Sequence, residues 1–344
     1  MPEKLKKQFQ AYKEIVKSDS PLYHFIADKI SEDEKYLTQL KSYAVDASFI
    51  PLFFTAVLKS LYIYEDDLRD YYLNFMDKPK APDDRLLHHF KAFTNRYMTN
   101  ISQDIRRYNL KKNIVERSSA LIPIFTQIIK SSGHEHFNMI ELGTRAGLLL
   151  NYDWYGYTFN KSVVIGDTEQ MNIKVRINQY DSLDKIEPLV HPNQKIGITR
   201  NKMDITTEED HLWLLSLYYP EENKRRKYYN KARKLFLEHP VDIYEGEEIQ
   251  LLDEQLSVLP EDEPIIIFHI HVTKHWSDER KQQLLAVIQK HAQSKEIYHV
   301  HHQIFNSDIY LDSFFEGNVK REKLAHFDLN KLQIEWLFNQ PIKL

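Results

Sequence analysis

Residues 139–150 read MIELGTRAGLLL, and this stretch decides the fold. A short apolar run ends at Leu142, a loop bounded by Gly143 and Gly147 follows, and a second apolar run begins at Leu148. The pattern predicts a buried strand, a tight turn and a helix. Gly143 would allow the turn, and Gly147 would allow the helix to pack closely on the strand.

Strand-like runs recur after this stretch and alternate with helical segments at 208–237 and 278–293. Such alternation is typical of a mainly parallel sheet with helices on both faces. The segment 158–180 differs, because it reads as a hairpin that turns at Gly166 and Asp167, and we interpret it as an insertion. The predicted strands of the domain are Ser162–Ile165, Ile173–Ile177, Lys195–Thr199, Val241–Tyr244, Pro264–His271 and Glu296–His302.

The first 131 residues follow a different pattern. They contain no glycine, whereas all eight glycines of the chain lie between 133 and 317. Ser20 before Pro21 predicts the start of one helix, and another is expected near Ser48. A proline-bearing loop at 77–84 precedes long helical segments at 86–107 and 113–130. We therefore expect an all-helical domain over 1–131 and an α/β domain over 132–344.

The composition excludes several classes of protein. The chain has 50 acidic and 46 basic residues, a formal charge of −4 and no cysteine. The near balance of charge argues against a dedicated nucleic-acid binder, so we expect none. The absence of cysteine excludes thiolate metal sites and disulfides. The charged N-terminus does not resemble a secretory signal, and no apolar run is long enough to span a bilayer. We expect a cytoplasmic protein without membrane association.

The loop after the predicted first strand lies where α/β sheets bind nucleotide-like ligands. Arg145 stands at the middle glycine of the dinucleotide fingerprint G-x-G-x-x-G, so a pyrophosphate could not approach the backbone closely. The acid at the strand end, Glu141, suits a cationic ligand with an amino group better than a diphosphate. The alternative interpretation is a glycine turn that only packs a helix against a strand.

The stretch from Glu141 to Tyr157, ELGTRAGLLLNYDWYGY, resembles the signature E-x-G-x-S-A-G-L-N-L-x-x-D-x-Y-x-Y of a bacterial family, domain of unknown function 2332. That family is related to class I S-adenosylmethionine-dependent methyltransferases. The resemblance implies a Rossmann-like, class I methyltransferase-like α/β fold with a mainly parallel sheet. Other segments resemble the family in the same order along most of the chain, namely Ser20–Tyr23, Asn113–Arg117, Gly197–Thr206, Phe268–His269 and Glu335–Leu337.

The resemblance also implies a site for S-adenosylmethionine. Glu141, Gly143 and Gly147 would contact the methionine half of the cofactor. Thr199 stands where the family has an acid for the ribose hydroxyls, and a threonine offers only a weaker, uncharged hydrogen bond. Glu247 matches the position of an acid near the adenine amino group.

His269 would lie at a strand end and face the transferred methyl group, and Asp153 is a second candidate base. Asn113 and Arg117 are four residues apart in a predicted helix, so they could bind substrate together or form a salt bridge between the domains. Tyr155 and Tyr157 could line the substrate site, or they could pack at the end of a helix.

Two hypotheses for function follow. In the first, the protein binds S-adenosylmethionine and, as an enzyme, transfers its methyl group to an unknown small-molecule or macromolecular acceptor. In the second, the protein is a catalytically degenerate relative that acts as a binding or regulatory module. Thr199, Arg145 and the replacement of family polar residues by Lys111, Lys112 and Ile114 favour the second hypothesis.

Histidines concentrate on two neighbouring predicted strands, with His269 and His271 on one and His299 and His301 on the other. Residues i and i+2 share a face of a strand, and imidazoles suit zinc, iron or nickel. No carboxylate stands at a clear ligand spacing, however. We therefore expect ordinary hydrogen-bonded histidines and no metal site.

Overall fold

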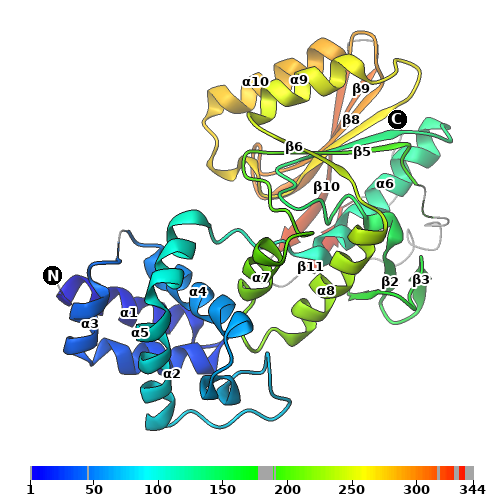
Figure 1. Ribbon diagram of the computed structural model, residues 1–344. Helices are drawn as coiled ribbons and strands as arrows, with labels where there is room; N and C mark the ends of the chain where they lie inside the picture. The colour runs from blue at the N-terminus through cyan, green and yellow to red at the C-terminus, as the bar shows by residue number, and fades with distance from the viewer. Residues whose placement is uncertain are drawn as a thin grey trace. The chain divides into compact units, whose positions relative to one another are not determined.

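A computed structural model describes residues 2–44, 46–176, 189, 191–315, 318–328 and 333–337. The chain forms two compact units (Figure 1). Unit 1 comprises Met1–Lys112 and Ile205–Lys227, and unit 2 comprises Asn113–Asp204 and Tyr228–Leu344. This division differs from the expected boundary at 131/132, because helix α6 (Ser118–Ser132) belongs to unit 2 and residues 205–227 belong to unit 1.

Helices joined by loops make up the described part of unit 1, which contains no strand. Ser20 accepts a hydrogen bond from the backbone N–H of Tyr23, which confirms the predicted N-cap. The long apolar run that begins at Phe49 forms a buried helix, and no helix in the described part of the chain is long and apolar enough to cross a membrane. The elements are α1 (Pro2–Val16), α2 (Pro21–Ser31), α3 (Glu34–Leu40), α4 (Phe49–Ile63), η1 (Asp67–Tyr71), α5 (Asp84–Arg107) and α7 (Glu208–Ser216), with the start of α8 (Asn223–Glu238).

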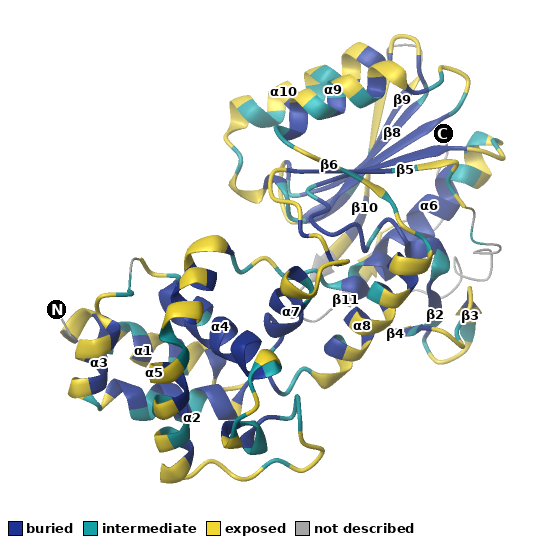
Figure 2. Cartoon of the chain, viewed as in Figure 1, coloured by how far each residue is buried: buried dark blue, intermediate teal, exposed yellow. Residues whose placement is uncertain are grey.

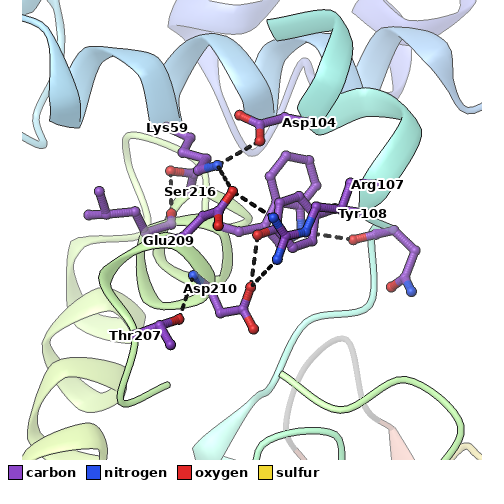
Figure 3. Close-up of polar contacts among 11 residues, drawn as sticks. Lys59, Asp104, Arg107, Tyr108, Thr207, Glu209, Asp210 and Ser216 are labelled. Carbon is purple, nitrogen blue, oxygen red and sulfur yellow. Dashed lines mark hydrogen bonds and ion pairs between the residues drawn. The ribbon is translucent and has the colours of Figure 1, made fainter. Parts of the chain in front are cut away.

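Polar contacts join α7 to the earlier helices of unit 1 (Figure 3). The Lys59 ammonium on α4 donates to Asp104 on α5 over 2.6 Å and lies 3.8 Å from Glu209 on α7. The Tyr108 hydroxyl donates to Asp210 over 2.8 Å. Because Lys59 and Asp104 are both buried, removing one of them would leave an uncompensated charge. These contacts explain why a segment distant in sequence completes the helical unit.

An eight-stranded mixed sheet forms the centre of unit 2 (Figure 1). Five parallel strands stand in the spatial order third, second, first, fourth, fifth, which is the order of a doubly wound sheet. Three antiparallel strands extend it in a meander. The strands, from one edge to the other, are β11 (Gln333–Trp336), β10 (Asn318–Asp328), β9 (Asp308–Phe315), β8 (Ile297–His302), β7 (Ile265–His269), β1 (Asn138–Leu142), β5 (Gln194–Thr199) and β6 (Asp242–Glu245).

Helices cover both faces of this sheet, as the continuous burial of its central strands requires (Figure 2). On one face, α9 (Glu248–Val258) and α10 (Asp278–His291) bury Leu252 and Leu284 in a cluster with Ile265 and Ile267 of β7. On the other face, α6 places Phe125 against Phe268, with ring centres 5.3 Å apart. The predicted α/β class is confirmed, and five of the eight strands of the sheet are parallel to one another.

The predicted insertion is a separate three-stranded sheet in the order β3-β2-β4. Its hairpin turns at Asn160 and Lys161, both with positive φ, and not at Gly166 and Asp167 as predicted. Gly166 instead follows β3, where its φ is 71°. The strands are β2 (Gly156–Phe159), β3 (Val163–Ile165) and β4 (Asn172–Val175), and the rest of the predicted segment, 177–180, lies outside the described residues.

Two predictions of helix are wrong. Residues 143–151, all described, form turns and bends in place of the helix expected after Gly147. Positive φ values at Gly143, Arg145 and Gly147 explain this, because a right-handed helix needs consecutive negative φ values. Helix α6 begins at Ser118, after the short 3₁₀ helix η2 (Val115–Arg117). Asn113 therefore lies in the loop between α5 and η2 and does not share a helical face with Arg117.

Candidate functional site

The loops after β1 and β7 meet at the carboxyl edge of the large sheet. Strands β1 and β7 are neighbours at the point where the strand order reverses, which is where doubly wound sheets bind ligands. Gly143 has a φ of 71°, and its N–H donates to the carbonyl of Ile198 over 2.7 Å. A Cβ atom on Gly143 would lie only 2.5 Å from Cγ2 of Val272. The side chain of Val272 therefore fills the space beside this glycine.

Glu141, at the end of β1, is buried together with its hydrogen-bond partner. Its carboxyl accepts a hydrogen bond from the Thr144 hydroxyl over 2.5 Å. Burial raises the pKa of Glu141 to about 8, although this hydrogen bond and the charge of Arg117 act in the opposite direction. The side chain is consequently neutral for the most part at pH 7, and a neutral acid attracts a cationic ligand only weakly.

The remaining predicted cofactor residues are engaged in contacts within the protein. Gly147 packs closely, since a Cβ atom there would lie 2.6 Å from Val241. Thr199 is buried at the end of β5, and its hydroxyl accepts a hydrogen bond from the N–H of Asn201 over 3.4 Å.

Glu247 is the N-cap of α9 and accepts hydrogen bonds from the backbone N–H groups of Ile249 and Gln250. Its carboxylate also pairs with Arg200 at 3.0 Å and with Arg280 at 2.5 Å. A carboxylate with four donors has little capacity left for an adenine amino group. The position is therefore explained by capping and ion pairing within the fold.

Asp153 lies apart from His269. Its carboxylate pairs with Lys195 at 2.5 Å and with His191 at 2.6 Å. Lys195 is near the amino end of β5, and His269 is at the carboxyl end of β7, so the two candidate bases occupy opposite edges of the sheet. A cavity of about 480 Å³ adjoins Asp153, and Trp154, Gly166 and His191 also line it.

Tyr155 and Tyr157 are fully buried, and their hydroxyls bond within the protein. Tyr155 donates to the carbonyl of Leu148 over 2.6 Å, and Tyr157 contacts Ser118 at 3.1 Å and the carbonyl of Tyr152 at 2.9 Å. These contacts hold the chain between β1 and β2 in place of the missing helix. They support the packing interpretation of the two tyrosines.

Arg117, one of the predicted substrate residues, lies near the carboxyl edge. Its charge acts on Glu141 of β1, on His271 after β7 and on His302 of β8. Asn113 lies four residues earlier in a non-helical segment and is half-buried. The edge therefore combines a guanidinium group, a neutral carboxyl group and several imidazoles.

The family model described as "Uncharacterized protein conserved in bacteria (DUF2332)" matches residues 6–336. The chain belongs to this family. No curated protein and no solved structure matches it. The match spans both units, so the helical unit is as much a part of the family as the sheet is.

A cluster of tyrosines and a glutamate lies in the helical unit of this family member, and one of them, Tyr23, belongs to the segment Ser20–Tyr23 that resembles the family. Tyr23 follows the Ser20 cap, and its ring is 6.3 Å from that of Tyr72 and 5.9 Å from that of Tyr219. Glu221 accepts a hydrogen bond from the N–H of Leu22 over 3.1 Å. Burial raises the pKa of Tyr23 and of Tyr72, so both phenols stay protonated. No pattern in the sequence indicated that these tyrosines would converge.

Three histidines of this family member, His269, His299 and His301, lie close together in the sheet. The spacing on the two predicted strands indicated this for these three, whereas His271 contacts His302 instead. The rings of His269 and His299 are 5.2 Å apart, and those of His299 and His301 are 4.8 Å apart. Burial lowers the pKa of all three, so the imidazoles are neutral near pH 7. The expectation of hydrogen-bonded histidines is wrong for His269 and His299, whose ring nitrogens have no hydrogen-bond partner within the described part of the chain.

Asp312 is the residue that sequence reasoning missed beside this cluster. It lies on β9, which pairs antiparallel with β8 and places Asp312 opposite His299. Its carboxylate is fully buried and accepts hydrogen bonds from Arg321 over 2.6 and 2.7 Å. Although burial opposes ionisation, these bonds lower the pKa of Asp312. The alternation of apolar and polar residues in DIYLDSFF could have predicted this strand, but not its register.

Proposed function

We propose that this family member is a catalytically degenerate relative of class I S-adenosylmethionine-dependent methyltransferases and acts as a binding or regulatory module. The observation that carries the proposal is the packing of Val272 beside Gly143, where the Val272 side chain would lie 2.5 Å from a Cβ on Gly143. The side chains around that contact are buried in the same way, with exposures of 5% for Glu141, 4% for Arg145 and 5% for Thr199. These three side chains offer a cofactor very little surface, although Gly143 and Val272 are partly exposed.

Two further features support the loss of cofactor binding. The loop after β1 leads into turns and bends, so no helix N-terminus directs its N–H groups at a ligand there. The acid expected near the adenine, Glu247, is held by Arg200 and Arg280. Relationship to methyltransferases is supported by the order of the five parallel strands and by the acid at the end of β1.

Binding of S-adenosylmethionine followed by methyl transfer is the second candidate function. The position of Glu141 at the topological switch point favours it, because that is where a doubly wound sheet binds its ligand. The buried, mostly neutral state of Glu141 weighs against it, since the amino and sulfonium groups of this cofactor are cationic.

Calorimetric titration with S-adenosylmethionine and with S-adenosylhomocysteine distinguishes the two functions. We expect no heat of binding and no shift in thermal unfolding at millimolar ligand, with circular dichroism confirming that the protein is folded. Binding at micromolar concentration would overturn the proposal and favour the second candidate. S-adenosylhomocysteine lacks the sulfonium charge, so binding of this ligand alone would also overturn it by showing that the pocket can open.

A further inference from the structure

The histidine cluster of unit 2 has the composition of a metal site. His299, His301 and Asp312 are fully buried, and they offer ligand atoms that all lie within 4.8 Å of one another. His269 lies on the neighbouring strand β7, paired with His301 in the register of the sheet. Three imidazoles and a carboxylate, without thiolate, are ligands that suit zinc and iron(II).

The hydrogen bonding of these histidines points to a ligand. A neutral imidazole has one N–H donor and one acceptor nitrogen, and buried polar groups are rarely left without partners. Both ring nitrogens of His269 and both of His299 have no hydrogen-bond partner in the part of the chain that the structure describes. A bound cation would use one acceptor lone pair of each ring, which no neighbouring donor uses.

The spacing of the rings matches a tetrahedral ion. With metal–nitrogen distances of about 2.0 Å and ring centres roughly 1 Å further out, the centres of two coordinated imidazoles lie about 5 Å apart. The observed separations are 4.8 Å for His299 and His301, 5.2 Å for His269 and His299, and 6.2 Å for His269 and His301. Two of the three pairs match this separation, whereas His269 is farther from His301 and is not among the three residues whose ligand atoms lie within 4.8 Å of one another.

Asp312 completes the set from the antiparallel strand. Its Oδ2 atom lies 3.4 Å from Nε2 of His301. Arg321 donates to both oxygens, but each carboxylate oxygen has a second lone-pair direction that can serve a metal ion. Arg321 then holds the carboxylate in place, as residues behind a metal ligand commonly do.

Partly exposed side chains lie beside the histidine cluster. Phe305 contacts the ring of His301 at 5.5 Å and is 51% exposed. The Arg321 guanidinium lies 4.1 Å from the centre of the Phe305 ring, and its side chain is also partly exposed. His301 itself is fully buried and also packs against Tyr310, with ring centres 5.6 Å apart.

We propose that His269, His299, His301 and Asp312 bind one divalent transition-metal ion, with Zn²⁺ the ion that the ligand set fits best. The inference goes beyond the proposed function, because it uses β7, β8 and β9 and does not depend on whether a cofactor binds beside Gly143. The neighbouring His302 is not part of the site, since its Nε2 atom contacts the carbonyl of Ser307 at 3.0 Å.

The test uses full-length protein without a polyhistidine tag, stripped with a chelator and titrated with Co²⁺ and then Zn²⁺. We expect one Co²⁺ per chain with the visible absorption of a tetrahedral site, displacement by Zn²⁺, and a rise in the melting temperature with Zn²⁺. His299→Gln and Asp312→Asn should each weaken Co²⁺ binding by roughly 100-fold. Each variant is compared with its own metal-free form, so that a loss of stability is not mistaken for a loss of binding.

His326→Gln is the matched control, because His326 is a half-exposed histidine on β10 that pairs with Asp308 outside the cluster. It should bind Co²⁺ as the wild type does. Equal affinity in the control and in the His299→Gln variant would overturn the inference, and so would failure of the wild type to bind Co²⁺ or Zn²⁺. Neither result would bear on the cofactor titration, so the two proposals fail separately.

Discussion

Replacement of Glu141 by glutamine tests the electrostatics of the carboxyl edge most directly. The pKa of Glu141 is about 8 in the folded protein, against a usual value of 4.5. Between these values the folded state holds a proton that the unfolded state has lost. Stability therefore falls as pH rises from about 4.5 to about 8.

The magnitude follows from the difference in pKa. Each unit corresponds to about 1.4 kcal/mol, so the full loss is about 5 kcal/mol. Most of it, about 3 kcal/mol, falls between about pH 5 and pH 8. Glu141→Gln keeps the shape of the side chain and cannot ionise, so this part of the pH dependence should disappear. The variant loses or gains a constant amount from its amide group, and the change with pH is the informative quantity.

The assay is urea denaturation at several pH values. Unfolding is monitored by the hydrogen exchange of a peptide that contains β1. This readout belongs to unit 2 and avoids mixing two unfolding transitions. Glu135→Gln is the control, because Glu135 is exposed just before β1, and its profile should follow the wild type. Parallel profiles of the wild type and Glu141→Gln would refute the reasoning, since another group would then carry the pH dependence.

Three further substitutions test the packing of the fold. Gly143→Ala should lower the free energy of unfolding by about 2 kcal/mol, because it combines a positive φ with the Val272 contact, and Val272→Ala should recover part of that loss in a double-mutant cycle measured by urea denaturation. Asp153→Ala should cost about 3 kcal/mol by leaving the partly buried Lys195 without its partner, and Asp153→Ala with Lys195→Met should cost less. Ser20→Ala should cost about 1 kcal/mol in unit 1, and an unchanged melting temperature there would contradict the capping role.

The sequence allowed prediction of β7 and β8, two strands that are buried along their whole length. The run from Pro264 to His271 contains β7, and the run from Glu296 to His302 contains β8, because both strands are buried on two faces and local composition reveals that. The helix after Gly147 could not be excluded in this way. Its apolar residues satisfy helical and irregular packing equally. Contacts distant in sequence, such as the hydrogen bond from Asn151 to the carbonyl of His239, help to hold the irregular conformation.

The candidate site was predictable only where it follows the chain locally. Glu141 and Gly143 lie together because they are two residues apart, and His299 and His301 share a face because a strand alternates. The pairing of His299 with Asp312 depends on the register of an antiparallel meander, which the sequence pattern does not fix. The position of Val272 beside Gly143 depends on three crossover connections, from β1 to β5, β5 to β6 and β6 to β7, and no local pattern predicts it.

The charges at the carboxyl edge bear on the proposed loss of cofactor binding. Glu141 is mostly neutral near pH 7, and Arg117 adds a positive charge close to it. Thr199 supplies no charge, and the carboxylate of Glu247 is neutralised by Arg200 and Arg280. A cationic cofactor would therefore meet repulsion from Arg117 with no free carboxylate to offset it. Asp312, one strand beyond His299, is paired with Arg321, so its charge is offset as well. What distinguishes the histidine cluster is the set of ring nitrogens of His269 and His299 that have no hydrogen-bond partner within the described part of the chain.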